Sequence, residues 1–144
     1  MHKPILTGLF ILAGAAALAH SGVQNQAVLA RMEAMKSIGD AMKVLGRMAK
    51  GQASFDASAA QDAAAGIARH SADTPALFTA RETDPKSEAK PAIWTDFADF
   101  TAKARALETA ALDVSKSLTS PDDLVPAVQR LGQACKSCHS LYRE

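Results

Sequence analysis

Apolar side chains recur every three or four residues along much of this chain, which is the spacing of one face of an α-helix. The clearest pattern runs over residues 92–118, where the apolar positions are Phe97, Phe100, Ala104, Leu107, Ala111, Val114 and Leu118. Residues 24–50 contain no proline, and their apolar face consists of Val28, Met32, Met35, Met42 and Ala49, flanked by Ile38 and Leu45. Both stretches are predicted to be helices of a bundle, and Gly51 is expected to end the first one.

The segment between these two helices predicts a weaker helix followed by a loop. Residues 56–71 are rich in alanine, begin at Asp56, a residue type favoured at a helix N-cap, and hold one large aliphatic side chain, Ile67. Residues 73–91 contain three prolines and mixed charges. They are therefore predicted to form the longest loop of the chain.

A fourth helix is predicted from a capping pattern near the C-terminus. Ser120, Pro121, Asp122 and Asp123 provide an N-cap, a proline at the first helical position and an acidic residue at the third, where aspartate replaces the usual Glu or Gln of a capping box. The apolar spacing then continues through Leu124, Val128, Leu131, Cys135, Cys138 and Tyr142. Both cysteines are therefore expected to face the core.

These elements predict an all-α fold, an antiparallel up-down-up-down four-helix bundle. Alanine, the strongest helix former, supplies about a fifth of the 144 residues, and we find no strand-like alternation, internal repeat or low-complexity tract after the first segment. The formal net charge of +1 and the lack of a basic stripe argue against nucleic-acid binding. Two cysteines are too few for a disulfide scaffold.

The first 19 residues are predicted to be a signal peptide, followed by the bundle over residues 20–144. A basic start at His2 and Lys3 precedes an apolar run, and an A-x-A ending at Ala19 provides the cleavage site. The alternative is an uncleaved membrane anchor, but the run of about 14 residues is shorter than the roughly 20 needed to span a bilayer. The mature chain would then be formally neutral, periplasmic and without a membrane span.

The chemistry of the chain is concentrated in Cys135-Lys136-Ser137-Cys138-His139. C-x-x-C-H is the attachment motif of c-type haem, and on a helix residues three and four apart share a face, so both sulfurs and the imidazole can meet one porphyrin. A thioredoxin-like redox pair, a zinc site completed by His70 or His20, and a simple disulfide between the two cysteines are the alternatives. One covalently attached haem c accounts best for the motif together with the export segment.

Three stretches of the chain resemble the cytochrome c prime family, the class II c-type cytochromes. The C-terminal residues 135–143 are similar to the family's C-x-x-C-H-x-x-aromatic-Arg motif. Residues 31–35, which begin with Arg31 and end with Met35, are similar to the R-x-x-x-M pattern of its first helix. Residues 90–94, Lys-Pro-Ala-Ile-Trp, are similar to the opening of its third helix. The resemblance implies a four-helix bundle with His139 as an axial iron ligand. It further implies either an empty sixth position that admits small gases or a methionine ligand and electron transfer.

The sixth ligand, if it is a methionine, is expected near the start of the first helix, because the end of helix four lies beside it in such a bundle. At 1.5 Å per residue, Met42 would lie about 10 Å and Met48 about 20 Å beyond Met35, too far from His139. Met32 and Met35 remain, and Met35 is preferred because it matches the family's methionine. The stretch Ala34-Met35-Lys36, together with Lys50-Gly51 just after the first helix, is more similar to the low-spin branch of the family. The alternative is that Met35 is only a core side chain.

Further residues are assigned from their positions relative to this motif. Arg31, one turn before Met35, is expected either to bind a haem propionate or to be solvated. Arg143 is expected to pair with a propionate or to cap the last carbonyls of its helix. Tyr142 and Trp94 are expected to be packing residues near the pocket, and His70 a surface or boundary residue.

The function predicted from the sequence is that of a periplasmic electron carrier with redox proteins as partners. The alternative is a five-coordinate protein that binds NO or CO. An enzyme is not expected, because no serine–histidine–acid or paired-carboxylate arrangement shares a face and His139 is committed to iron. The alanine-rich second helix would permit a homodimer.

Overall fold

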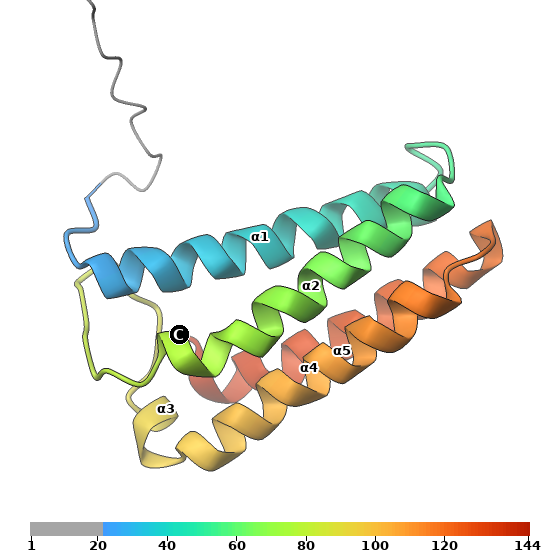
Figure 1. Cartoon of the computed structure of the whole chain (residues 1–144). Coiled ribbons are helices and arrows are strands. Elements are labelled where there is room, and N and C mark those ends of the chain that lie inside the picture. Colours follow the sequence, from blue (N-terminus) through green and yellow to red (C-terminus); the bar gives the residue numbers. More distant parts are fainter. Residues whose placement is uncertain (1–21) are drawn as a thin grey trace, which may run out of the picture.

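The computed structural model describes residues 22–144, and this part of the chain is built from helices (Figure 1). The four long helices are α1 (Gln26–Ala49), α2 (Ala57–Leu77), α4 (Phe97–Ser117) and α5 (Leu124–Tyr142). The shorter elements are α3 (Ala92–Thr95) and the 3-10 turn η1 (Pro121–Asp123). Within these residues the only extended pairing is an isolated bridge between Ala89 and Arg143. The all-α prediction is confirmed, whereas the predicted signal peptide lies outside the described residues.

The helices begin where side chains satisfy the first free backbone N–H groups. The carboxylate of Asp56 accepts a hydrogen bond from the Ala59 N–H, as predicted. The capping box at Ser120 and Asp123 is also present in full. Gly51, with a φ of 69°, follows α1 in the left-handed region that favours glycine and ends the helix as expected.

Two predicted boundaries are wrong. Helix α2 runs past the predicted end at 71 to Leu77 and includes Pro75, which has no N–H to donate to the Ser71 carbonyl. Pro75 lies in the last turn of the helix, and about one turn or less before it Ser71 and Thr74 donate their hydroxyls to the carbonyls of Ile67 and His70. The predicted helix over 92–118 is divided into α3 and α4 at Asp96, which adopts a φ of −134° and caps α4 by accepting from the Asp99 N–H.

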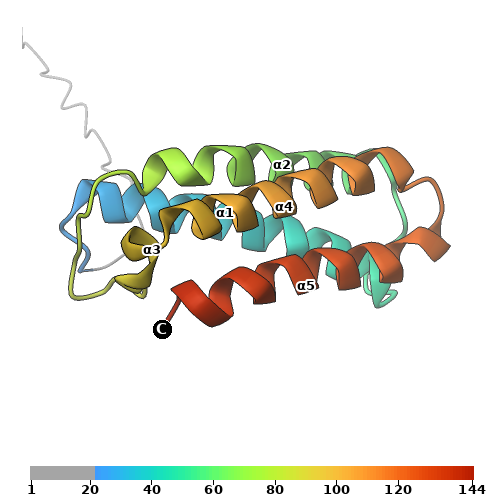
Figure 2. The ribbon, with the colours of Figure 1, turned by 90° about the horizontal axis from the view of Figure 1, so that it is seen from below.

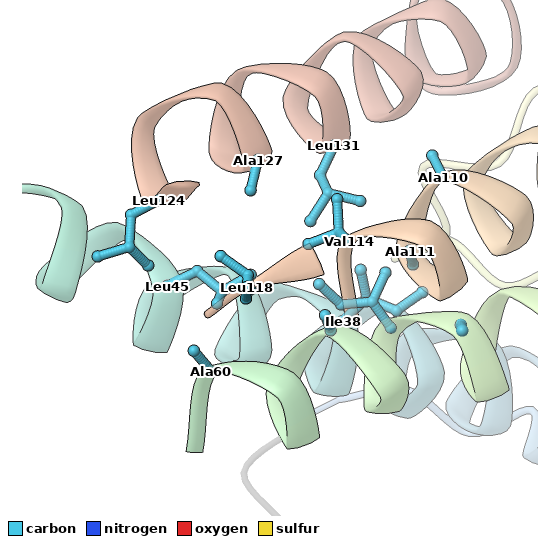
Figure 3. Close-up of a cluster of buried hydrophobic side chains, with 13 residues drawn as sticks. Ile38, Leu45, Ala60, Ala110, Ala111, Val114, Leu118, Leu124, Ala127 and Leu131 are labelled. Atoms are coloured by element: carbon cyan, nitrogen blue, oxygen red, sulfur yellow. The ribbon is translucent and has the colours of Figure 1, made fainter. Parts of the chain in front are cut away.

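The long helices pack as the predicted antiparallel bundle, in which α1 contacts α2 and α5, and α4 contacts α2 and α5 (Figures 1 and 2). One end of the bundle holds a core of small and aliphatic side chains, which we call the aliphatic end (Figure 3). Its fully buried members include Leu45, Ile67, Leu118, Leu124 and Leu131. Here the helices touch directly, and burial of these side chains supplies the main driving force for folding.

The opposite end of the bundle, where α1 begins and α5 finishes, is built differently. Its buried cluster consists of Phe78, Ile93, Phe100 and Tyr142, and we call it the aromatic end. Phe78 follows α2 directly, and Ile93 lies in the short helix α3, which covers this end of the bundle (Figure 1). No helix among residues 22–144 is long and apolar enough to cross a membrane.

Candidate functional site

A cavity of about 560 Å³ opens between α1, α4 and α5 beside the aromatic end. Cys135, Cys138 and His139 all line it from the last turns of α5, and each is half-buried. Cys138 also packs against the aromatic cluster. The predicted inward orientation of both cysteines is therefore confirmed, and the three residues of the motif share one face as their spacing requires.

The remaining walls of the cavity are largely apolar. Much of the wall comes from α1, α3 and α4, including Val28, Ile38, Ile93, Phe100, Ala104 and Leu107. A porphyrin is a broad apolar ring with a charged edge, and cofactor pockets of this size are lined mainly by apolar side chains with a few placed polar groups. The donor set, two thiols and an imidazole at the wall of an apolar cavity, fits a covalently held haem.

Burial shifts the pKa of each of the three motif side chains. Burial, followed by the charge of Arg143, lowers the pKa of His139, which favours the neutral imidazole that a metal requires. Burial raises the pKa of both cysteine thiols, whereas a thioredoxin-like pair needs a lowered one. Among residues 22–144 no three His, Cys, Asp or Glu side chains gather as a metal site would need, and both cysteines are free.

Three methionines of α1 line the cavity: Met32, Met35 and Met42. The spacing argument put Met42 too far from His139 to bind the iron, but its side chain lies at the wall of the same cavity. The cavity wall follows α1 from Val28 to Met42, roughly 21 Å of helix, so that residues nearly four turns apart share it. Met35 lies midway along this wall and packs in part against the aliphatic cluster. Met48 is not among the residues that line the cavity, and it packs against the aliphatic cluster.

Arg31 is neither solvated nor directed at solvent, since only 3% of it is exposed. Its Nε donates to the Leu77 carbonyl at 2.9 Å, Nη1 to the Glu82 carbonyl at 2.8 Å, and Nη2 to the Ala80 carbonyl at 2.7 Å. The solvated alternative is therefore wrong. The side chain lines the cavity, but most of its hydrogen-bonding capacity serves the segment that follows α2.

Arg143 forms an ion pair with Glu88, and both side chains line the cavity and are about half exposed. Its Nε and Nη2 lie 2.6 Å and 2.5 Å from Glu88 Oε2. The adjoining backbone groups pair as well, because Lys90 N–H donates to the Tyr142 carbonyl and Glu144 N–H to the Glu88 carbonyl. These contacts fasten the end of the chain to the loop before α3, and the predicted capping of α5 carbonyls by the Arg143 side chain is not seen.

The two aromatic residues assigned to packing do pack at this end of the bundle. Tyr142 is buried edge-on against Phe100, and its hydroxyl donates to an Asp99 carboxylate oxygen at 2.6 Å. That hydrogen bond is the main reason why the pKa of Tyr142 is raised. Trp94 donates its indole N–H to the Phe78 carbonyl at 2.7 Å. His70 is half-buried on α2, in line with a boundary position.

Sequence reasoning missed several residues around the cavity. Phe78 and Glu88 lie in the stretch predicted as a loop without further role, and Lys86 and Lys103 also line the cavity. The adjacent apolar pair Leu77 and Phe78, within a polar segment, is the one sequence feature that indicates a buried anchor there. Glu88 has no such feature, because its partner lies 55 residues further along the chain.

An antiparallel bundle that carries C-x-x-C-H at the end of its last helix, open to an apolar cavity, defines the class II c-type cytochromes. The family model described as Cytochrome C' matches residues 26–143. The chain belongs to this family. It is thus an electron-carrying cytochrome of the c type with covalently attached haem c.

Individual relatives agree with this assignment. A cytochrome c-556 of Agrobacterium tumefaciens is 40% identical over 112 residues, which cover 76% of this chain and 89% of the relative. The solved cytochrome c' from Rhodopseudomonas palustris matches with a TM-score of 0.78 and 33% identity, covering 84% of this chain and 98% of that one. The nitric oxide complex of a mutant cytochrome c prime from Alcaligenes xylosoxidans matches with a TM-score of 0.72 and 29% identity over 82% and 94%.

Proposed function

We propose that this protein carries single electrons through a haem whose iron is held by His139 and Met35. The observation that supports this is the shared cavity: His139 enters it from α5 and Met35 lies midway along the α1 wall. Met35 also corresponds to the methionine of the family's first helix. A thioether is a suitable soft ligand for haem iron, and His/Met ligation raises the reduction potential.

The other residues of the site would hold the cofactor and control its surroundings. The sulfurs of Cys135 and Cys138 would form thioethers to the porphyrin, and His139 would bind the iron through a neutral imidazole. The bound haem would supply a one-electron couple, which the protein tunes through its ligands and burial. Lys86 and Lys103 also line the cavity and would supply positive charge to the charged edge of the group. The apolar wall would exclude water from the iron.

A five-coordinate protein that binds NO or CO is the second candidate. The observation in its favour is that Met35 packs against the aliphatic cluster, as a methionine that only fills space would do. The relative solved as a nitric oxide complex shares the fold. The two candidates differ in whether the sulfur of Met35 is bonded to iron.

Replacement of each cavity methionine in turn separates these candidates. We expect Met35→Ala to convert the low-spin absorption and electron paramagnetic resonance spectra to high-spin ones and to open the iron to CO. Met32→Ala and Met42→Ala are matched controls, because both side chains line the same cavity, and each should keep the low-spin spectrum. A Met35→Ala spectrum identical to that of the parent protein would contradict Met35 ligation. A spectral change confined to one control variant would identify the methionine replaced in that variant as the ligand.

We also propose that residues 1–19 direct export and that the mature protein works in the periplasm with redox proteins as partners, not as an enzyme. The mass of the exported protein tests the first part. It should equal that of residues 20–144 plus one haem, whereas an intact N-terminus would favour the membrane anchor. A homodimer through the alanine-rich face of α2 is compatible with this role, and sedimentation of the same sample would detect it.

A further inference from the structure

Arg31 is a buried cation on the helix that carries Met35, one turn before it. Burying a guanidinium is unfavourable unless its N–H groups and its charge are compensated. The compensation here comes from three backbone carbonyls of residues 77–82, from the negative charge of Glu82 and from two ring faces, with the guanidinium carbon 4.6 Å from the Phe78 centroid and 5.5 Å from that of Trp94. Because these carbonyls belong to the segment that follows α2, Arg31 fixes the start of α1 to that segment.

The contacts continue from Phe78 to the helix that carries His139. The Phe78 ring lies 5.0 Å from that of Phe100 on α4, and Phe100 lies 5.4 Å from Tyr142 in an edge-to-face arrangement. Tyr142 stands one turn beyond Cys138 on α5, and its hydroxyl bond to Asp99 fastens it to α4. A continuous series of buried contacts therefore joins Arg31 on α1 to Tyr142 on α5, and we call this series the aromatic clasp.

The cavity makes this series important. At the aliphatic end, buried side chains in direct contact set the distance between helices. Beside the aromatic end the cavity lies between α1 and α5, so direct packing cannot set the distance between Met35 and His139 there. Contacts that pass around the cavity can therefore contribute to this distance, together with the direct packing of α1 on α5 at the aliphatic end, and the aromatic clasp is such a path.

We propose that Arg31 is a positioning residue, which sets the separation between the Met35 segment of α1 and the His139 segment of α5 through the aromatic clasp. This inference rests on the proposed placement of haem in the cavity but not on a bond between Met35 and iron. If Met35 is the ligand, loosening α1 lets its sulfur leave more often. If it is not, loosening α1 widens the crowded space above the iron. Both cases give CO faster access.

The test is the rate of CO association with the reduced holoprotein, measured for Arg31→Met and Arg31→Lys. Arg31→Met keeps an unbranched, flexible side chain but is shorter and loses all three carbonyl bonds, and it should raise the rate by at least about tenfold, or ~1.4 kcal/mol of barrier. Arg31→Lys should give an intermediate rate, because one ammonium cannot reproduce the fork of the guanidinium. Arg47→Met, an exposed position in the last turn of α1, is the matched control and should keep the parent rate.

A second variant keeps the test decisive if Arg31→Met does not fold. Phe78→Leu interrupts the aromatic clasp at its next contact and should accelerate CO association in the same direction. Folded Arg31→Met, or Phe78→Leu in its place, with lowered stability but the parent CO rate would overturn the proposal, since Arg31 would then be only a structural residue. A parent protein that is already high-spin would contradict Met35 ligation alone, and the ratio of variant to parent rates would still test the positioning role.

Discussion

The two ends of the bundle solve the same packing problem in different ways. At the aliphatic end, side chains such as Leu45, Leu118 and Leu131 are fully buried against one another (Figure 3). At the aromatic end, rings and polar contacts surround a cavity of about 560 Å³. At the aliphatic end, side chains fill the space between the helices, whereas at the aromatic end the cavity can hold another group.

Side-chain hydrogen bonds between residues far apart in the sequence gather mainly at the aromatic end. The hydrogen bonds of Arg31 to residues 77–82, the acceptance of backbone N–H groups by Asp84 and the Arg143–Glu88 pair all lie around the cavity. They hold together the loop before α3, the start of α1 and the end of α5. In this region the cavity interrupts direct apolar packing between the helices. Changes at the aliphatic end should therefore alter stability without altering the haem, and changes at the aromatic end should alter the haem first.

The largest expected effect is the loss of the cofactor itself. Replacement of both Cys135 and Cys138 by serine removes the thioether bonds, and the purified protein should carry no covalent haem. Mass spectrometry and a denaturing gel stained for haem measure this directly. Ser137→Ala, at an exposed position between the two cysteines, is the control and should keep full attachment. Covalent haem in the double variant would refute the assignment of both sulfurs.

A smaller effect should come from a cavity cut into the aliphatic end. Leu131→Ala removes a side chain that is fully buried on α5, and the free energy of unfolding should fall by about 2–5 kcal/mol. The absorption spectrum of the folded variant should not change, because Leu131 does not line the haem cavity. Denaturant unfolding and the spectrum are measured on the same sample.

Val125→Ala on the same helix is the matched control for this substitution, since Val125 is half exposed. Its effect should stay within about 0.5 kcal/mol. A Leu131→Ala protein that changes spin state would show that the two ends are not separable.

The smallest expected effect concerns acid stability at the aromatic end. The Asp84 carboxylate accepts from the N–H groups of Lys86, Gln24 and Asn25, and these bonds lower its pKa below the ordinary 3.8. A lowered folded-state pKa contributes stability that is present above 3.8 and is lost as the pH falls through the folded-state value. Asp84→Asn should therefore destabilise the protein at neutral pH and flatten the loss of stability below pH 4.

Unfolding followed by circular dichroism between neutral pH and pH 2 measures this difference. Asp62→Asn, at an exposed position on α2, is the control and should keep the parent profile. Equal acid sensitivity of Asp84→Asn and the parent protein would show that the contacts of Asp84 do not contribute.

Much of this architecture is readable from local sequence features. The helical spacing of apolar residues, the N-cap at Asp56, the capping box at Ser120 and the C-x-x-C-H motif each act over a few residues, so the bundle and the attachment site follow from them. The extension of α2 through Pro75 and the break at Asp96 do not, because neighbouring side chains and tertiary packing outweigh the local preference there.

The surroundings of the cavity were harder to predict, for a physical reason. The acceptors of Arg31 lie 46 to 51 residues away and are backbone carbonyls, which carry no residue-specific pattern. Whether Met42 lines the cavity also depends on how far the cavity extends along α1. Sequence spacing predicts which residues share a helix face, but it does not predict how much of that face a cofactor cavity occupies.

The central claim, a haem held between His139 and Met35, is tested most directly by the absorption spectra of the exported parent protein, oxidised and reduced, before and after addition of CO. We expect covalent haem with a low-spin spectrum that does not change at once on addition of CO, because both axial positions are filled and CO can bind only when the Met35 sulfur leaves the iron. A high-spin spectrum that shifts on addition of CO would contradict the claim and make Met35 only a part of the cavity wall.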